Sequence, residues 1–256
     1  MSDFNYLATG EHNFKQFINI IKRLFVDENK KYDLVIGMGN TGLVMLKLNE
    51  LILNELKIKM PPTLTLPLLR FSDNNEKELF NNDIFLEEVK KQIEGIEKIQ
   101  NILFVDDEIY RGISLKTALG LLMKVKGTDH LQVTVVAEDQ GFQWHNDIQN
   151  VDIEFCPFAH EVEGHNNVIF YMIPSEYDKP IKDAFPEDIL KWHTRINILL
   201  GLPIKIMIDG KPEYTFKFNQ EAEEKVANFR QLQVDFLTHL KDLIRKSIVP
   251  ATRSSA

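Results

Sequence analysis

The chain has one cysteine among its 256 residues, which excludes an internal disulfide bond and any zinc site built from several cysteines. No apolar run is long enough to cross a bilayer, and the start MSDFNYLATG lacks the basic and then apolar order of a secretion signal. Bases are the minority charge: 30 Lys and Arg against 38 Asp and Glu give a net charge of −8, which disfavours a broad electrostatic contact with nucleic acid. These absences predict a cytoplasmic protein with neither nucleic acid nor a membrane as a partner. The cysteine, Cys156, lies in an apolar run and is expected to be a small core residue.

Apolar residues spaced for strands and helices occupy most of the first 175 positions. Helical spacing predicts helices over 11–26, 43–56, 84–99 and 114–125. Short apolar or β-branched runs predict strands over 32–37, 63–69, 102–106, 131–137, 151–156 and 168–173. Strands that alternate with helices favour an α/β fold, a parallel twisted sheet with helices on both faces.

The character of the sequence changes after Pro174, where predicted helices over 186–200 and 220–245 flank a short strand at 203–208. We therefore divide the chain into an N-terminal helical extension (1–31), an α/β core (32–175) and a mostly helical C-terminal region (176–256). The C-terminal helices are expected to cover a site as a hood, to form a homodimer or simply to pack on the core.

The segment 101–115 says most about function. A buried-strand run over 102–105 ends in Asp106 and Asp107, and a short loop with one glycine then leads to Ser114, which opens an amphipathic helix. Helix N-termini and loop N–H groups accept phosphate, whereas two strand-end carboxylates accept hydrogen bonds from ribose hydroxyls or approach a magnesium ion. The pattern predicts a site for a phosphorylated sugar.

This segment, from the apolar run through the paired acids to the glycine and the hydroxyl residue, resembles the phosphoribosyl pyrophosphate (PRPP) motif of type I phosphoribosyltransferases. The resemblance implies a Rossmann-like core that binds PRPP and Mg²⁺. Asp106 and Asp107 would be the catalytic residues on the ribose hydroxyls, and they would hold the metal, directly or through ribose or water, with Asp139 as a further candidate. The loop on the 5-phosphate would consist of Tyr110, Arg111, Gly112, Ile113 and Ser114.

The activity that the resemblance implies is that of a glycosyltransferase of nucleotide metabolism. Such an enzyme transfers the phosphoribosyl group to a base or another nucleophile and releases pyrophosphate. The acceptor is not readable from the sequence. Tyr110 stands where the purine-salvage branch keeps an aspartate, which argues against that branch.

A second ligand-type turn, Gly37-Met38-Gly39-Asn40-Thr41-Gly42, lies between a predicted strand and a predicted helix. It matches G-x-G-x-x-G, so a dinucleotide-binding Rossmann protein is one alternative. That reading needs an acid at the end of the next strand, where this chain has Arg70. In phosphoribosyltransferases the corresponding loop contacts pyrophosphate through its N–H groups. The resemblance assigns that role to Gly39, Asn40, Thr41 and Gly42.

Two more alternatives remain open. A non-catalytic sensor or regulatory module would use the same pocket to capture PRPP or a nucleotide; Tyr110, Ile113 and Asn40, which are atypical of the enzymes, favour it. The run 102–108 also looks like the start of a receiver domain, which would need a later strand-end aspartate and a lysine before proline, as in Lys179-Pro180.

Other polar residues are weaker candidates. His160 and His165 are five apart in a glycine-containing segment, so they do not share one helical face as H-E-x-x-H requires, and a solvated loop is expected there. Trp144 and His145 either stack on a base or pack at the core rim. The charged segment 70–100 is either a mobile loop over the substrate or an ordinary connection.

Overall fold

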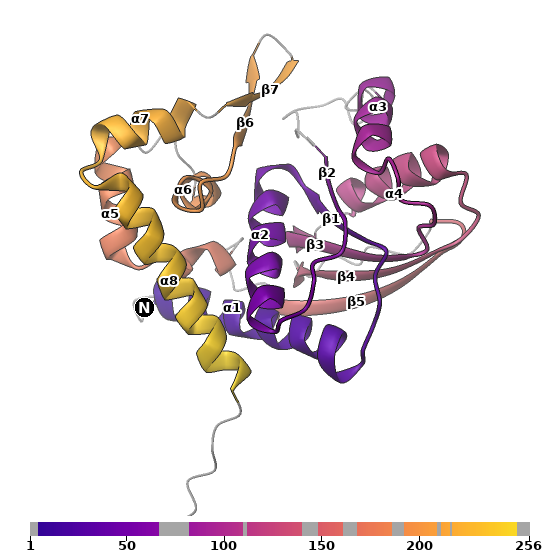
Figure 1. The fold of residues 1–256 in the computed structure, drawn as a ribbon, viewed down its shortest axis with the longest axis horizontal. Coiled ribbons are helices and arrows are strands. Elements are labelled where there is room, and N and C mark those ends of the chain that lie inside the picture. Colours follow the sequence, from indigo (N-terminus) through magenta and orange to yellow (C-terminus); the bar gives the residue numbers. More distant parts are fainter. Residues whose placement is uncertain are drawn as a thin grey trace, which may run out of the picture.

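The computed structural model describes residues 5–66, 82–109, 112–139, 148–160, 168–185, 192–208, 211–215 and 217–249. Five strands form one all-parallel sheet in the order β2-β1-β3-β4-β5 (Figure 1). They are β1 (Leu34–Met38), β2 (Thr63–Leu66), β3 (Asn101–Ile109), β4 (Leu131–Asp139) and β5 (Val151–His160). The predicted α/β class with a parallel sheet is confirmed.

Helices cover both faces of this sheet because the side chains of its buried strands alternate between two apolar clusters. Val35 and Leu103 face the cluster shared with α1 (Tyr6–Lys22) and α2 (Gly39–Glu55). Their neighbours along the strands, such as Ile36 and Phe104, face the second cluster. That cluster also holds buried residues of α3 (Asn82–Gln92) and α4 (Ile113–Lys126). Strands buried on both sides account for the nearly continuous apolar runs in the sequence.

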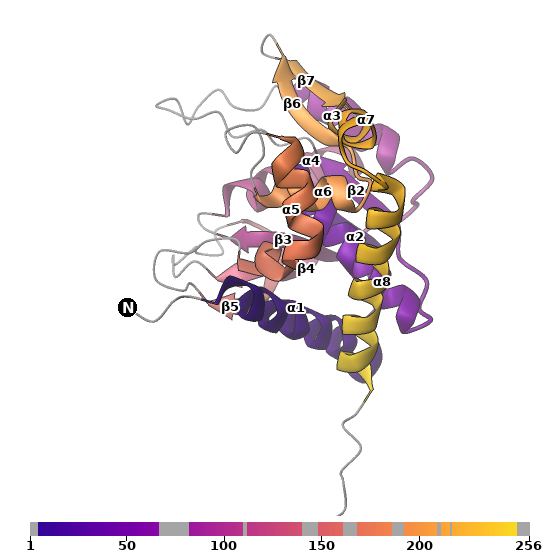
Figure 2. The same cartoon turned by 90° about the vertical axis from the view of Figure 1, so that its left-hand side faces the viewer.

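The C-terminal region continues the first of these layers. Its elements are α5 (Ser175–Ala184), α6 (Trp192–Leu199), the antiparallel pair β6 (Ile204–Ile208) and β7 (Lys211–Thr215), α7 (Lys217–Lys225) and α8 (Phe229–Ile248). α8 contacts both α1 and α2, and it lies on their side of the molecule (Figure 2). Buried side chains of α6 and α8 belong to the same apolar cluster as those of α1 and α2, so these helices share the core of the sheet.

Two predictions of secondary structure in this part of the chain are wrong. The segment predicted as a strand over 168–173 is a 3-10 helix, η2 (Val168–Met172), and its backbone packs directly against α1 at Gly10. The single helix predicted over 220–245 is two helices, α7 and α8. Asn228 lies between them in the left-handed conformation, with φ 55°, which an α-helix cannot continue through.

Other helix bounds differ at their ends. α1 starts earlier than predicted, because the side chain of Asn5 accepts a hydrogen bond from the N–H of Ala8 at 3.1 Å and caps the first turn. It runs into a π-helical turn, η1 (Arg23–Asp27). α3 ends at Gln92 rather than near position 99, and Gly95 in the following turn has φ 83°. α5 was not predicted. Within the described ranges, no helix combines the length and the apolar character needed to span a bilayer.

The outer edge of β2 is closed by a side chain. The N–H of Thr65 donates to Oε1 of Gln92 at 2.8 Å, and Nε2 of Gln92 donates to the carbonyl of Thr65 at 2.8 Å. The amide of Gln92 thus imitates the peptide group of a neighbouring strand, and it satisfies an edge that would otherwise be open to pairing with another chain.

Replacing Gln92 by alanine should therefore lower the free energy of unfolding by about 1–2 kcal/mol, because both hydrogen bonds to the edge are lost. Gln231→Ala is a matched control, since Gln231 is an exposed helix residue whose side chain, within the described ranges, bonds to Asp235 alone, at 2.8 Å. It should change stability by less than about 0.5 kcal/mol. Urea unfolding followed by circular dichroism measures both. Equal effects in the two variants would contradict this role of Gln92.

Candidate functional site

The sheet order identifies where a ligand site is expected. β1 is followed by α2 and β2 on one side of it, and the chain then returns to place β3 on the other side of β1. The connections after β1 and β3 therefore leave the sheet toward opposite faces. In folds of this kind the usual ligand site lies between two such connections, at the carboxyl ends of the strands, and we refer to this place as the crevice. Gly37 and Val105 are register partners near these two strand ends. The structure thus brings together the two segments that the sequence singles out.

The glycine-rich segment after β1 is helical rather than a loop. α2 begins at Gly39, so Gly39 to Gly42 form its first turn, which corrects the expectation of a separate pyrophosphate loop. The N-cap residue Met38 makes no side-chain capping bond, and the first turn contains no acidic residue. Gly39, Asn40 and Thr41 are partly exposed. The N–H groups of the first turn of a helix have no partner within the helix, and this end carries a partial positive charge. In α2 this end lies at the crevice.

Each glycine of this segment has a structural reason. A Cβ on Gly37 would lie 2.5 Å from the carbonyl oxygen of Gly42, and one on Gly42 would lie 2.5 Å from the carbonyl carbon of Gly37. Gly39 has φ 64°, in the left-handed region. The two outer glycines thus let α2 pack directly on β1, and the middle one makes the turn from strand to helix.

The acidic pair lies inside a strand. β3 does not end at Asp106 as predicted but continues to Ile109, because pairing with β4 resumes at Glu108 after a bulge that begins beyond Val105. A bulge of this kind re-aims side chains locally. Asp106 and Asp107 are 8% and 5% exposed, and the N–H of Asp107 donates to Oδ1 of Asp106 at 3.1 Å.

Burial and the negative charge of Asp107 raise the pKa of Asp106 well above its ordinary value, and Glu108 adds to the effect. Two adjacent carboxyl groups in a poorly solvated place cannot both ionise cheaply. The fold therefore sustains an electrostatic cost at this point, which is a common property of binding and catalytic sites.

The second helix at the crevice is α4, which follows β3. Its N-cap, Gly112, has φ 66°, and it offers no side-chain cap. The first turn contains no acidic residue. Tyr110 and Arg111 lie outside the described residues, as do the side chains of Ile113 and Ser114, so their predicted contacts with a 5-phosphate stay predictions.

More carboxylates lie across the bulge on β4. Glu108 is the register partner of Glu138, and Ile109 that of Asp139, the last residue of the strand. Glu138 is fully buried, whereas Asp139 is partly exposed. Burial and the neighbouring Tyr6 raise the pKa of Tyr171 in η2, and the charge of Glu138 raises it further. Glu138 therefore lies near Tyr171.

Sequence reasoning singled out Asp139 on β4 rather than its fully buried neighbour Glu138. The signal that could have indicated Glu138 as a site residue is its position as a charged residue just before the end of β4. Among the described residues, no three His, Cys, Asp or Glu side chains are grouped so as to hold a metal ion by themselves.

Several other candidates fall elsewhere. His160 ends β5, while His165, Trp144, His145 and Arg70 lie outside the described residues. The pair at 179–180 lies inside α5 rather than after a strand, which weighs against the receiver reading. The strand order also weighs against a dinucleotide-binding Rossmann protein. In that fold the second and third strands both lie on the same side of the first strand, whereas here β2 and β3 lie on opposite sides of β1.

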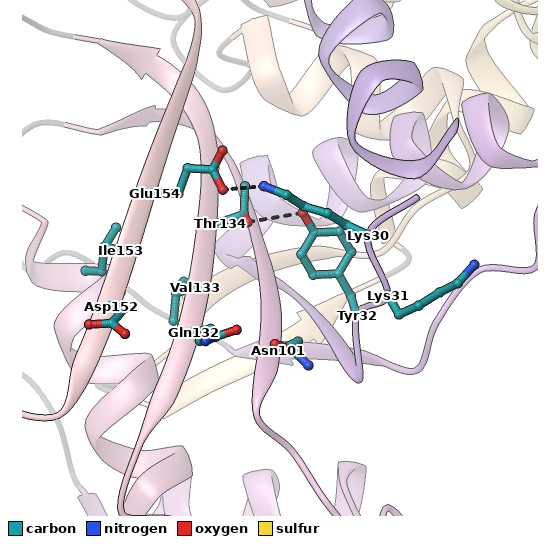
Figure 3. Close-up of a pocket in the computed structure, with 10 residues that line it drawn as sticks. All are labelled: Lys30, Lys31, Tyr32, Asn101, Gln132, Val133, Thr134, Asp152, Ile153 and Glu154. Atoms are coloured by element: carbon teal, nitrogen blue, oxygen red, sulfur yellow. Dashed lines mark hydrogen bonds and ion pairs between the residues drawn. The ribbon is translucent and has the colours of Figure 1, made fainter. Parts of the chain in front are cut away.

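A second hollow, of about 540 Å³, lies at the opposite, amino-terminal end of the strands (Figure 3). The segment before β1 forms one wall, and the hydroxyl of Tyr32 donates to Oγ1 of Thr134 at 3.1 Å. Lys30 pairs with Glu154 across the hollow, and His130 lies 3.0 Å from the lining residue Asp152. These side chains already pair with one another, so the hollow is a structural junction between the segment before β1 and the start of β5.

Cys156 of β5 is a buried core residue next to this junction, as the sequence predicts. Nη2 of Arg23 donates to its Sγ at 3.2 Å. Burial raises the pKa of the Cys156 thiol, with a further contribution from Glu154. A thiol in this protonated state is a poor nucleophile and a poor metal ligand.

The five-stranded parallel sheet, with helices on both faces and a reversal of strand order at β1, defines the chain as a doubly wound α/β protein. No protein-family model matches the chain, and no curated protein matches it. Among solved structures, the chain is similar to a hypothetical protein from Neisseria gonorrhoeae whose crystal structure has bound ppGpp. The two are 14% identical, the match covers 58% of this chain and 82% of that one, and the TM-score is 0.37. A similarity of this degree carries no conclusion about the ligands of this chain.

Proposed function

We propose that the chain binds PRPP together with Mg²⁺ at the carboxyl ends of β1 and β3, as a protein of the type I phosphoribosyltransferase kind. The supporting observation is that two helix N-termini without side-chain caps, those of α2 and α4, flank a buried pair of carboxyl groups at the switch point of the sheet. PRPP needs both kinds of partner, because it carries anionic phosphates at its two ends and neutral hydroxyls between them.

Asp106 and Asp107 also fit a magnesium ion, since their two carboxyl groups lie within hydrogen-bond reach of each other. Mg²⁺ prefers oxygen ligands from one or two carboxylates together with phosphates. Magnesium would neutralise charge on the departing pyrophosphate. The two carboxyl groups would accept hydrogen bonds from the ribose hydroxyls and stabilise positive charge that develops at the anomeric carbon as its bond to pyrophosphate lengthens. The N–H groups of the first turn of α2 would hold the pyrophosphate, and those around Gly112 the 5-phosphate.

The direct test is isothermal titration calorimetry of the protein with PRPP, with and without MgCl₂. We expect binding that needs magnesium and that exceeds the binding of ribose 5-phosphate by about tenfold or more, because the pyrophosphate adds charge-assisted hydrogen bonds to α2. A screen for pyrophosphate release across purine and pyrimidine bases then identifies the acceptor. Absence of heat with PRPP under all these conditions would sink the proposal.

A non-catalytic sensor is the second candidate, and one feature of the site favours it. The first turn of α2 carries Asn40 and Thr41 and has no lysine or arginine to balance the charge of a leaving pyrophosphate. Helix N–H groups alone suffice for binding, but they supply less stabilisation of a departing anion. Magnesium-dependent binding without pyrophosphate release from any base would identify a sensor.

A further inference from the structure

A side chain of the C-terminal region bonds to the candidate site. Asn197 of α6 is fully buried, and its Nδ2 donates to the main-chain carbonyl of Asn40, in the first turn of α2, at 3.2 Å. The residues are 157 positions apart in the sequence. The other half of the same amide, Oδ1, is buried and accepts no hydrogen bond within the described part of the chain.

A buried amide that uses only one of its polar atoms is a poor choice for stability alone. Leaving a buried acceptor unsatisfied costs more than the single remaining hydrogen bond contributes, and an apolar side chain of the same size would serve the core at least as well. The position of Asn197 is therefore better explained by what its one hydrogen bond does to α2.

The helix that carries Asn197 is fixed from two sides. Arg195, two residues earlier, forms a buried ion pair with Asp178 of α5, with Nη1 and Oδ1 3.0 Å apart. Gln233 of α8 donates from Nε2 to the carbonyl of Ile198 at 2.7 Å. Because α5 and α8 both bond to α6, the position of Asn197 is fixed independently of α2.

We propose that Asn197 is a positioning residue that fixes the first turn of α2 at the crevice. By holding the carbonyl of Asn40, it orients the peptide units of this turn so that their N–H groups point at the anion-binding place. Its importance for PRPP rests on the proposed function, whereas its effect on α2 does not. The C-terminal region is then a part of the site.

The experiment compares Asn197→Leu with Asn49→Leu. Asn49 is a matched control, because it is also fully buried, also has an Oδ1 without a partner among the described residues, and bonds only to Sδ of Met60 at 3.4 Å. Hydrogen exchange is measured at the amides of Leu43 and Val44, which in an α-helix bond to the carbonyls of residues 39 and 40. We expect exchange at these two amides to rise about fivefold to tenfold in Asn197→Leu and to stay unchanged in Asn49→Leu, while both variants melt near the wild-type temperature.

In titrations with PRPP and MgCl₂, Asn197→Leu should bind at least about fivefold more weakly than Asn49→Leu, since part of the binding free energy is spent on ordering the turn. Unchanged exchange at Leu43 and Val44 overturns the inference, whether or not PRPP binds. If exchange is faster in Asn197→Leu but the wild type does not bind PRPP, the proposed ligand is wrong and the positioning role of Asn197 is confirmed. If Asn197→Leu does not fold, Asn197→Ala and Asn49→Ala serve the same comparison.

Discussion

Replacing Gly37 by alanine should lower the free energy of unfolding by about 3 kcal/mol, because the added methyl group has no room. Its Cβ would lie 2.5 Å from the carbonyl oxygen of Gly42 and 2.7 Å from Cγ of Leu46. Leu46 can adjust in part, but the oxygen belongs to the backbone of α2. Relief therefore requires the whole N-terminal end of α2 to move away from β1. That movement opens the core on one face of the sheet and displaces the turn assigned to pyrophosphate.

The same substitution at Gly120 is the control, with the opposite sign expected. Gly120 lies exposed in the interior of α4, and among the described residues a Cβ there would meet no atom within 4 Å apart from its own turn of helix. Alanine should therefore stabilise the protein by about 0.5–1 kcal/mol, because it restricts the unfolded chain. Urea unfolding of both variants gives the two values. A Gly37→Ala protein as stable as the wild type would show that α2 does not pack on β1 as closely as the structure has it.

The outline of this fold was predictable from the sequence because its cause is local. Alternating apolar runs and helical periodicities follow from burial of the sheet on both faces, and parallel strands necessarily align their carboxyl ends. The convergence of the segments around Gly39 and Asp106 could therefore be anticipated. The role of Gly37 and Gly42 could not be predicted, because glycine is required both where a helix packs closely on a strand and where the backbone contacts a phosphate.

The remaining features depend on contacts between distant parts of the chain. Nothing in the local sequence distinguishes the apolar run of η2 from a strand; its contact with Gly10 is a tertiary one. β3 runs past Asp106 against the low strand propensity of acidic residues because β4 supplies pairing partners beyond the bulge. The bond from Asn197 to Asn40 joins segments that no periodicity relates.

Replacing Asp106 and Asp107 together by asparagine should weaken magnesium-dependent PRPP binding about 100-fold or more, because loss of even an outer-shell partner of a metal ion costs about 10- to 100-fold in affinity. The fold should tolerate the change, because asparagine has nearly the same shape and removes the repulsion between two adjacent carboxyl groups in a buried place. An exposed carboxylate in the turn before β4, Asp129, provides the control, and Asp129→Asn should bind like the wild type. Unchanged affinity in the double variant would contradict the assigned site.

The single variant Asp106→Asn should differ from the wild type in its stability as a function of pH, measured by urea unfolding with EDTA present. Because burial and Asp107 raise the pKa of Asp106 in the folded state, the folded protein holds this proton after the unfolded chain has released it. Below about pH 4 both states are protonated and the carboxyl group costs nothing. Between about pH 4 and the raised pKa of Asp106 in the folded state, the wild type loses stability as the pH rises, whereas the asparagine variant keeps it. Above that pKa the difference in free energy of unfolding between the two proteins is constant.

Asp106→Asn should accordingly be more stable than the wild type at pH 7, although it binds PRPP more weakly. Added Mg²⁺ should narrow the gap, since a metal ion compensates the charge of the wild-type pair and has less to bind in the variant. Stability and ligand binding would then change in opposite directions at one residue, as expected where a fold accepts a local cost for the sake of a site. A variant less stable than the wild type across this whole pH range would mean that Asp106 supports the fold, and that its burial has no bearing on a ligand.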